Sequence, residues 1–463
     1  MDFDLVVLGA GSGGYACALR AAQLGMNVGL VERDLVGGTC LHRGCIPTKA
    51  LLHAAEVADA AREGSRFGVH ATVDSIDLAG VQSYSDAVVA KLYQGLTGLV
   101  RSRGITVVRG EGRLVLADGK PAVGVAGEVH RAPYVVLGSG SRTRTLPGVE
   151  VDGEVVLTSD SALRLAQLPG SAIVLGGGVI GCEFASAWRS FGVEVTVVEA
   201  LPRLLPTEEP ASSAALERAF RKRGITALTG VALRSCARTG KGVDVELADG
   251  RTLTADVLLV AVGRAPATAG LGYAEAGVAL DRGFVTVDGR LETSVPGVFA
   301  VGDLVSGLQL AHRGFAHGMF VAEEVAHRTG RLEAAPVLVA DRDIPRVTYS
   351  DPEVASVGLT EEQARAEHGD VETLTYDLSG NGRSQILRTA GFVKLIRRVD
   401  GPVVGVHLVG ARVGELIGEA QLITGWDAYP EEVAAMPHAH PTQHEALGEA
   451  HLALAGRPLH VHG

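Results

Sequence analysis

Residues 5–14 read LVVLGAGSGG, an apolar strand that leads directly into a glycine-rich turn. A helix-like segment follows as far as Leu24, and a second apolar stretch, residues 28–31, ends at Glu32. A strand, a G-x-G-x-x-G turn, a helix, a strand and an acidic residue, in this order, are typical of a dinucleotide-binding unit. The glycines let the backbone approach a pyrophosphate at the helix N-terminus, and the acidic side chain accepts hydrogen bonds from a ribose.

The same unit recurs later in the chain. Residues 172–175 form an apolar strand before the turn GGGVIG, and residues 195–198 form another that ends at Glu199. Gly9 and Gly176 are 167 positions apart, and so are Glu32 and Glu199. One glycine-rich turn is weak evidence for a dinucleotide site, because such turns also occur for purely structural reasons. Two copies in one register predict two dinucleotide sites rather than two structural turns.

The second site favours NAD over NADP. A carboxylate at Glu199 would repel a 2′-phosphate and accept a hydrogen bond from a free 2′-hydroxyl. No arginine pair follows within the next two residues, and Arg203 comes only after Pro202.

Length and composition predict a multidomain globular protein. A chain of 463 residues exceeds what one hydrophobic core usually supports. The net charge of −11 argues against a nucleic-acid partner or an anionic membrane surface, and no apolar run is long enough to span a bilayer. The acidic first residues enter a strand directly and do not read as a secretory signal. We therefore expect a cytoplasmic protein.

Other apolar strands also end in small residues. Residues 134–137 lead into GSGS, residues 258–262 into Gly263, and residues 298–301 into Gly302 and Asp303. Open α/β sheets bind ligands at this end of their strands. Asp303 can alternatively cap the segment that follows it.

The proline-bearing stretches 145–150 and 264–268 are typical of hinges around an inserted nucleotide domain. After about Pro336 the pattern changes. Residues 392–396 and 403–409 read as antiparallel strands, followed by helices, which predicts a separate C-terminal domain.

Two of the five cysteines lie close together. Residues 37–49 read GGTCLHRGCIPTK and contain Cys40 and Cys45, and small or apolar residues recur at helical spacing after them. Residues five apart in a regular helix are roughly 7.5 Å or more apart, whereas a disulfide usually needs Cα atoms within about 7 Å. If the two cysteines are bonded, the segment must depart from a regular helix. Gly44 tolerates such a departure, and Pro47 suits the first turn of the next helix.

Catalytic, structural and metal-binding roles all compete for this pair. A helix N-terminus and Lys49 would both stabilise a thiolate. A metal site lacks a second ligand pair, so we expect no metal. Two inert buried cysteines at this spacing are a less favoured alternative. The other cysteines we expect to be structural: Cys17 and Cys182 in the core, and Cys236.

A histidine-rich segment lies near the C-terminus. Residues 437–445 read PHAHPTQHE and precede an apolar helical run, 446–454. His440 stands before a proline at the helix entrance, where the helix dipole would disfavour a charged imidazole and Glu445 would favour it. Such a balance suits a histidine that exchanges protons with a thiol near neutral pH. Two alternatives stay open. Glu445 can form a capping box with Thr442, and the histidines at 438, 440, 444 and 451 can be a surface cluster.

With these motifs the chain resembles the class I pyridine nucleotide–disulfide oxidoreductases, and within them the dihydrolipoamide dehydrogenases. The similarity covers nearly the whole chain and rests on residues 9–14, 37–49, 176–183, 302–303, 311–312 and 438–445. It implies an α/β fold with two Rossmann-like dinucleotide-binding domains, for FAD and NAD, and a C-terminal α+β dimerisation domain. The limits that we expect are 1–147 for the FAD domain, 148–268 for the NAD domain, 269–336 for a central domain completing the FAD site, and 337–463 for the interface domain.

The resemblance also implies the cofactor contacts. FAD would lie against Gly9, Gly11, Gly13, Gly14, Glu32, Thr39, Lys49, Gly112, Gly140, Asp303 and Ala311. NAD would lie against Gly176, Gly178, Val179, Gly181, Glu199 and Gly263.

The catalytic roles follow from the same resemblance. Cys45 would be the thiol in charge-transfer contact with the flavin, and Cys40 the thiol that exchanges with substrate. Lys49 and Glu183 would pair near the flavin ring. His440, oriented by Glu445, would be the acid–base and would reach the cysteines of the other subunit of an obligate homodimer.

The implied reaction is the oxidation of dihydrolipoamide, free or on a lipoyl domain, with NAD. The chain would then serve as the corresponding component of 2-oxo acid dehydrogenase complexes. A glutathione-reductase-like enzyme would need basic residues near Glu199 to bind NADPH. A mercuric-reductase-like enzyme would need a C-terminal cysteine pair, but no cysteine follows Cys236. The intact Cys40, Cys45 and His440 argue against a non-catalytic complex subunit.

The chain departs from the family pattern at four places. His42 and Arg43 stand where Asn-Val is common, and Gln309 stands where methionine is usual. Residues 315–317 replace a more acidic stretch, and His444 replaces a common serine. None of these changes removes a catalytic group, but they bear on substrate preference.

Overall fold

The computed structural model describes residues 2–460. Within them the chain forms two compact units. The first contains residues 2–50, 79–144 and 264–341, and the second contains residues 51–78, 145–263 and 342–460. The chain therefore leaves and re-enters the first unit next to the two proline-bearing stretches predicted to be hinges.

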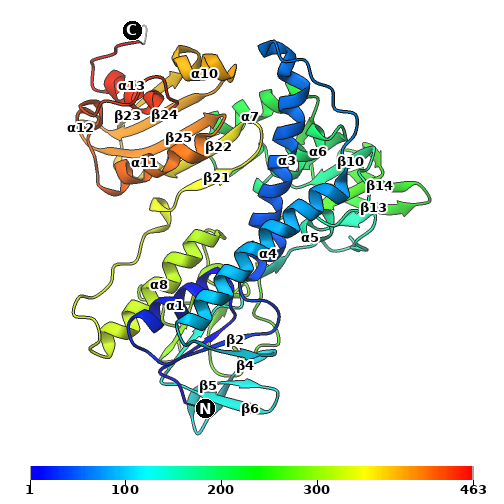
Figure 1. Ribbon diagram of the computed structural model, residues 1–463. Coiled ribbons are helices and arrows are strands. Elements are labelled where there is room, and N and C mark those ends of the chain that lie inside the picture. The colour runs from blue at the N-terminus through cyan, green and yellow to red at the C-terminus, as the bar shows by residue number, and fades with distance from the viewer. Residues whose placement is uncertain (1, 461–463) are drawn as a thin grey trace. The chain divides into compact units, whose positions relative to one another are not determined.

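A parallel sheet of five strands forms the centre of the first unit, in the order β20-β7-β1-β2-β3. These strands are β1 (Leu5–Leu8), β2 (Val28–Glu32), β3 (Thr106–Arg109), β7 (Tyr134–Leu137) and β20 (Val298–Ala300). The valine- and leucine-rich β1 is buried throughout, as expected of a parallel strand covered on both faces. Helices α1 (Ser12–Gln23) and α8 (Ala311–Arg328) lie side by side and share one apolar core with β1 (Figure 1).

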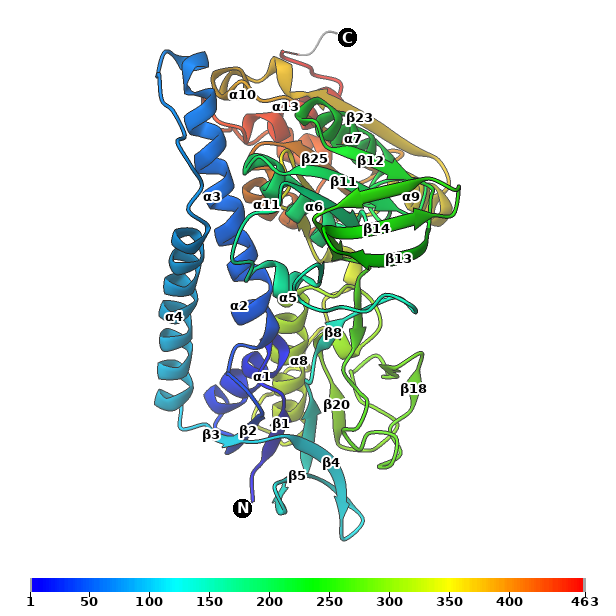
Figure 2. The same cartoon turned by 90° about the vertical axis from the view of Figure 1, so that its right-hand side faces the viewer.

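Short elements complete the first unit. An antiparallel sheet contains β4 (Gly112–Ala117), β5 (Lys120–Val125) and β6 (Glu128–Arg131), of which Figure 2 shows β4 and β5. Two ribbons pair β8 (Ser141–Thr143) with β17 (Arg264–Pro266) and β18 (Leu280–Asp281) with β19 (Phe284–Val285). The remaining helical elements are α2 (Gly38–Arg43), α4 (Leu78–Ser102) and the turn η2 (Gly302–Leu304). Helix α3 (Cys45–Glu63) begins in the first unit and continues in the second.

The second unit contains a parallel sheet of the same design, in the order β12-β11-β10-β16-β9. Its strands are β9 (Val156–Leu157), β10 (Ser171–Leu175), β11 (Glu194–Glu199), β12 (Thr226–Thr229) and β16 (Val257–Val260). The accompanying elements are helices α5 (Ser159–Ala162), α6 (Val179–Ser190) and α7 (Pro210–Arg223), and the antiparallel strands β13 (Leu233–Thr239), β14 (Gly242–Leu247) and β15 (Thr252–Ala255). Strand β10 lies between β11 and β16 as β1 lies between β2 and β7, so the repeat in the sequence is a repeat of the fold.

An antiparallel sheet forms the C-terminal part of the second unit, in the order β21-β22-β25-β24-β23. Its strands are β21 (Arg346–Thr348), β22 (Glu353–Gly358), β23 (Val371–Asp377), β24 (Phe392–Arg398) and β25 (Val403–Gly410). The helices are α9 (Glu361–His368), α10 (Gly382–Leu387), α11 (Val413–Gly425), α12 (Pro430–Ala434) and α13 (Glu445–Leu454). Side chains of α11 and α13 share one core with β24 and β25. The short turns η1 (Gly64–Phe67), η3 (Asp341–Asp343) and η4 (Leu378–Gly380) complete the second unit and its link to the first.

The predicted fold class is confirmed: two Rossmann-like units and a C-terminal α+β part. Each apolar stretch predicted to be a strand is one, although the predicted strands 258–262 and 298–301 end earlier, at Val260 and Ala300. The four predicted domain limits stay a prediction. Within residues 2–460, no helix combines the length and apolar character needed to cross a bilayer.

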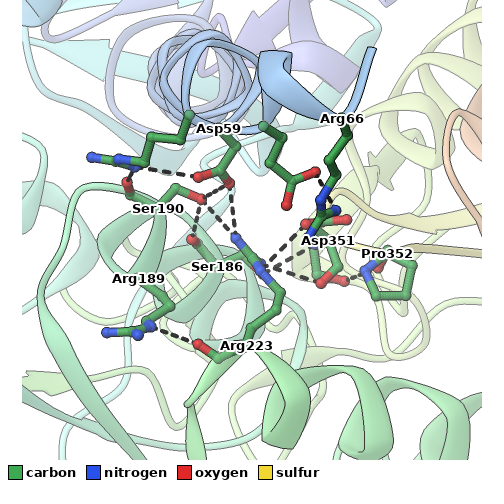
Figure 3. Close-up of polar contacts among 11 residues, drawn as sticks. Asp59, Arg66, Ser186, Arg189, Ser190, Arg223, Asp351 and Pro352 are labelled. Atoms are coloured by element: carbon green, nitrogen blue, oxygen red, sulfur yellow. Dashed lines mark hydrogen bonds and ion pairs between the residues drawn. The ribbon is translucent and has the colours of Figure 1, made fainter. Parts of the chain in front are cut away.

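A polar network in the second unit fixes the C-terminal half of α3. Ser190 on α6 donates a hydrogen bond to Asp59 on α3 at 2.5 Å. Arg223, the last residue of α7, donates to Ser190 Oγ at 2.7 Å and to Asp59 at 3.1 Å. The same guanidinium pairs with Asp351 at 3.3 Å, so it lies between two carboxylates (Figure 3). Three segments distant in the sequence are thus joined at one side chain.

Candidate active site

The two close cysteines form a disulfide, with Cα atoms 4.6 Å apart. Cys40 lies in α2, and Cys45 is the first residue of α3. The helix is interrupted at Gly44, where φ is −134° and ψ is −108°. The expected departure from a regular helix is confirmed, because this break brings the two Cα atoms closer than a continuous helix would.

The second cysteine has the position that stabilises a thiolate. Cys45 begins a helix of 19 residues, so its sulfur lies at the positive end of the helix dipole. Pro47 lies in the first turn, as predicted, and Lys49 follows one turn after Cys45.

The two unusual residues between the cysteines are both engaged in contacts. A ring nitrogen of His42 donates to the Val36 carbonyl at 2.9 Å, and the ring meets Tyr93 edge-on with centroids 5.2 Å apart. Arg43 forms an ion pair with Asp34. The extra polar bulk is therefore held by neighbours within the first unit.

The first glycine-rich turn has the geometry of a dinucleotide-binding loop. Gly9 has a φ of +102°, and a Cβ there would clash with Gly138 O. Gly11 caps α1 in extended backbone, and no heavy atom lies within 4 Å of the position that a Cβ would take. The carboxylate of Glu32 accepts hydrogen bonds from Ala10 N at 2.7 Å and from Asp34 N at 2.8 Å.

The second turn repeats these features 167 residues later. Gly176 has a φ of +109°, and Gly178 caps α6 in extended backbone with the same open space in front of it. Glu199 accepts from Gly177 N at 2.6 Å and from Leu201 N at 2.7 Å. These donors are the counterparts of those around Glu32. That the two glutamates hold their own loops was not predicted from the sequence, although their shared register was the available signal.

Both turns fit a dinucleotide pyrophosphate. Helices α1 and α6 begin without a capping side chain and without an acidic residue in the first turn. Their first N–H groups therefore face a space that only glycine leaves open. The donor set and the space suit a bound phosphate at each turn.

The other residues expected at FAD and NAD are distributed over both units. Asp303 lies in η2 and accepts from Ser141 Oγ, which in turn accepts from Arg264 Nε at 2.6 Å. Ala311 is the first residue of α8. Of the other expected contacts, Gly13 and Gly14 lie in α1, Thr39 in α2, Gly112 in β4, Gly140 directly before β8, and Val179 and Gly181 in α6, while Gly263 directly precedes β17.

Gly112 and Asp303 are held by contacts within the first unit. The space in front of Gly112 is filled by the side chains of Leu8 and Val31, so this glycine permits close packing of β4. Ser141 and Arg264, which orient Asp303, were not identified from the sequence, because their contact joins segments 123 residues apart.

Glu183 is almost fully buried on α6, with 2% of its surface exposed. Its carboxylate accepts a hydrogen bond from Tyr349 N at 3.0 Å. The expected pairing of Glu183 with Lys49 stays a prediction.

His440 and Glu445 form the expected pair. The imidazole Nδ1 and Glu445 Oε1 are 2.7 Å apart, and 78% of the His440 side chain is exposed. Burial alone would raise the pKa of Glu445, but hydrogen bonds from Thr442 N and from His440 lower it below its usual range. The carboxylate is therefore ionised, and it orients the imidazole.

The predicted capping box is wrong in one half. Thr442 N donates to Glu445 Oε2 at 2.8 Å, as expected. The Thr442 hydroxyl, however, donates to Ala439 O at 2.7 Å, and α13 is capped by His444 without a side-chain hydrogen bond. The hydroxyl thus donates to a carbonyl that precedes it, and no hydrogen bond from the first turn of α13 to its oxygen is present.

The alternative of a surface cluster of histidines is tested by how exposed the rings are. His438 pairs with Glu419 at 2.7 Å, and this hydrogen bond raises the pKa of His438. His451 is buried, and burial lowers its pKa to about 4. His440 alone of these three is largely exposed, so the simple surface cluster is wrong.

The remaining cysteines are structural, as predicted. Cys17 and Cys182 are fully buried, and burial raises the pKa of Cys17 to about 12. Cys236 packs against the core of the second unit. In the described part of the chain, no group of three or more His, Cys, Asp or Glu side chains is arranged to hold a metal ion.

Comparisons with known proteins cover almost the entire chain. Residues 3–318 match the family model described as pyridine nucleotide-disulphide oxidoreductase, and residues 344–451 match its dimerisation domain. A dihydrolipoyl dehydrogenase of Bacillus subtilis is 39% identical over 476 aligned residues, which cover 99% of each chain.

Solved structures agree with this match. LpdA from Mycobacterium tuberculosis has a TM-score of 0.90 at 29% identity, covering 97% of this chain and 99% of that one. The HOCl-induced flavoprotein disulfide reductase RclA from Escherichia coli, solved as a Cu(II) complex, has a TM-score of 0.86 at 26% identity, with coverages of 98% and 100%.

Proposed function

Because the chain belongs to the pyridine nucleotide-disulphide oxidoreductase family, we propose that it oxidises dihydrolipoamide with NAD, as a dihydrolipoyl dehydrogenase. The observation that carries this proposal is the Cys40–Cys45 disulfide at the head of α3, in a chain with two dinucleotide-binding turns. FAD and NAD are the cofactors of such an enzyme.

FAD is assigned to the first turn and NAD to the second. The space at Gly11, the carboxylate of Glu32 and the oriented carboxylate of Asp303 support the FAD assignment. At the second turn, Glu199 is held by two backbone N–H groups beside the open space at Gly178. This carboxylate disfavours a 2′-phosphate, so NAD is preferred to NADP. The contacts of Thr39, Lys49, Gly112, Gly140, Ala311 and Gly263 with these cofactors are part of the same proposal.

The chemistry begins with the two thiols of dihydrolipoamide. His440 takes the proton of one thiol, and the resulting thiolate attacks the sulfur of Cys40. A mixed disulfide forms and Cys45 leaves as a thiolate. The second substrate thiol then loses its proton to solvent, and its thiolate attacks the substrate sulfur of the mixed disulfide. The cyclic disulfide product closes, and Cys40 leaves as a thiolate that takes up the proton held by His440. The electron pair of the substrate now resides on the two cysteines.

The chain's own groups promote these steps by orientation and charge. Glu445 holds His440 through Nδ1, which leaves Nε2 as the atom that accepts the proton. The N-terminus of α3 stabilises the Cys45 thiolate, and Lys49 and Glu183 are assigned a supporting ion pair. Held at the first turn by the space at Gly11 and by Glu32 and Asp303, FAD would supply a two-electron acceptor for the thiols and a hydride donor for NAD.

We propose a cytoplasmic homodimer that serves 2-oxo acid dehydrogenase complexes. The chain carries a dimerisation domain, and His440 lies exposed within it, available to the cysteines of a partner subunit. The proposed domain limits are 1–147, 148–268, 269–336 and 337–463.

Steady-state assays test the proposed activity. The purified flavoprotein is expected to reduce NAD with dihydrolipoamide, to use NADP at least about tenfold less efficiently, and to leave glutathione disulfide unreduced. Reduction of glutathione disulfide with NADPH at a comparable rate would replace dihydrolipoamide by glutathione as the substrate.

A further inference from the structure

The segment between β20 and α8 carries Asp303 and is held by side chains of α8. Arg313 is 3% exposed and donates to three carbonyls of this segment, Val305 O at 3.3 Å, Ser306 O at 2.8 Å and Leu308 O at 3.1 Å. The guanidinium also pairs with Asp341 at 2.6 Å. One buried cation thus fixes the second half of the segment.

The first half of the segment is held by a histidine. His317 lies one turn after Arg313 on α8 and is also 3% exposed. Gly302 N donates to His317 Nδ1 at 3.3 Å. Nδ1 can accept this hydrogen bond only while it carries a lone pair, because both nitrogens of an imidazolium are donors.

The surroundings keep His317 neutral. Burial lowers its pKa to about 4, the positive charge of Arg313 acts in the same direction, and Asp341 opposes both. Arg20, the only charged residue of the neighbouring helix α1, pairs instead with Glu323. Asp303, next to Gly302, is bound by Ser141.

We propose that His317 is a positioning residue for FAD: as a neutral hydrogen-bond acceptor it holds the Gly302–Asp303 turn, and its protonation promotes release of the cofactor. The inference rests on the proposed role of Asp303 at FAD. It gives a function to one of the departures from the family pattern, the histidine in residues 315–317.

The direction of the pH effect follows from the two states of the ring. In the closed turn the pKa of His317 is about 4, and in a turn opened by cofactor loss it returns toward its ordinary value of 6.5. Between these values the open turn binds the extra proton, so falling pH favours opening by up to about tenfold per pH unit. Above this range the hydrogen bond is fully present.

The test compares FAD release from four holoproteins, followed by the fluorescence of free flavin after dilution. The variants are His317→Gln, whose amide oxygen accepts a hydrogen bond without titrating, and His317→Leu, which leaves Gly302 N–H without an acceptor. His327→Gln is the matched control, because His327 lies on the same helix. Its ring forms a hydrogen bond with the Leu332 carbonyl and not with the Gly302–Asp303 turn.

At about pH 7.5, His317→Leu is expected to release FAD roughly tenfold faster than the wild type, since a buried donor loses its partner. His317→Gln is expected to stay close to the wild type there. Between about pH 6.5 and pH 5, release from the wild type and from His327→Gln accelerates by about tenfold more than release from His317→Gln.

Equal release rates and equal pH profiles for all four proteins would overturn the inference. If His317→Leu is poorly folded, the pH profile of His317→Gln decides by itself. Asp303→Asn separates this outcome from failure of the FAD assignment. If Asp303→Asn retains FAD like the wild type, the proposed role of Asp303 is wrong. If Asp303→Asn loses FAD and the His317 variants do not, the inference about His317 is wrong.

Discussion

At the scale of single residues, position within a helix separates the two bonded cysteines. Cys45 begins α3 and meets its dipole, whereas Cys40 lies inside the short helix α2. Sequence reasoning predicted the need for a break at Gly44, because helix geometry and disulfide geometry conflict. It did not predict the orientation of the Thr442 hydroxyl, because this group can either accept from a backbone N–H of the next helix or donate to a preceding carbonyl, and it does the latter.

Replacing Cys45 tests the role of the pair. Cys45→Ser is expected to abolish lipoamide-dependent turnover by at least about a thousandfold while FAD remains bound, because the electron pair loses its path from substrate to flavin. Turnover and the flavin absorption spectrum are the measurements, with Cys236→Ser as a control that keeps full activity. Unimpaired turnover of Cys45→Ser would contradict the assignment.

Replacing His440 tests the acid–base role. His440→Gln is expected to slow reduction of the disulfide by dihydrolipoamide by at least about a hundredfold, and diaphorase activity with artificial acceptors far less, because only the first reaction needs proton transfer from a thiol. His460→Gln is the matched control, since His460 also pairs with a carboxylate, Glu449, at 2.8 Å. Equal losses in both assays would indicate a structural role for His440.

The His438–Glu419 pair predicts a pH dependence of stability. The pKa of His438 is raised by its hydrogen bond with Glu419, while for Glu419 burial is outweighed by this hydrogen bond and its pKa is lowered. The stability that His438 contributes is fully present below the ordinary histidine pKa and is lost as the pH rises through the raised pKa of His438. The Glu419 contribution is complete above its ordinary pKa and disappears as the pH falls through its lowered value.

The pair therefore stabilises most between about pH 4.5 and pH 6.5. His438→Asn is expected to lower the free energy of unfolding by about 1.5 kcal/mol near pH 5.5 and by much less at pH values above about 9. Tm measured for both proteins across this range checks the prediction. A loss of stability that is independent of pH would show that the ion pair is not its cause.

At the scale of elements, the strands were predictable and many contacts between elements were not. Buried parallel strands read as apolar runs, and a glycine-rich turn marks the end of β1 and of β10. The anchoring of α3 at Asp59 depends instead on Ser190, 131 residues away, and on Arg223. No local pattern indicates such a pairing, because it arises only when the helices pack.

Replacing Arg223 tests this anchoring. Arg223→Met is expected to lower the stability of the second unit by about 1–3 kcal/mol and to speed amide exchange in the last turns of α3, since Asp59 loses a charged partner. Hydrogen exchange followed by mass spectrometry measures this, and Arg221→Met, an exposed change on the same helix, is the control. Unchanged exchange near Asp59 would mean that Arg223 does not hold α3.

At the scale of the whole molecule, the internal repeat is the feature that the sequence predicted best. Both parallel sheets place the first strand of the repeat between two corresponding neighbours. The hydrogen bonds of Glu32 and Glu199 to their glycine-rich turns also match at a spacing of 167 residues. The second partners of these glutamates, Asp34 N and Leu201 N, keep the same spacing. Because both copies need the same backbone geometry, they keep glycines and a glutamate at the same positions, and these residues are visible in the sequence. The residues that orient Asp303 or hold its turn belong to only one copy and could not be found in this way.

The thiol content of the holoprotein during one catalytic cycle shows whether electrons pass through the Cys40–Cys45 disulfide. Under anaerobic conditions, one equivalent of dihydrolipoamide is added, and the thiols are alkylated and located by mass spectrometry before and after addition of NAD. We predict that Cys40 and Cys45 become labelled, that NAD restores the disulfide, and that one NADH forms per dihydrolipoamide oxidised. NADH formation while Cys40 and Cys45 stay bonded throughout would contradict the account.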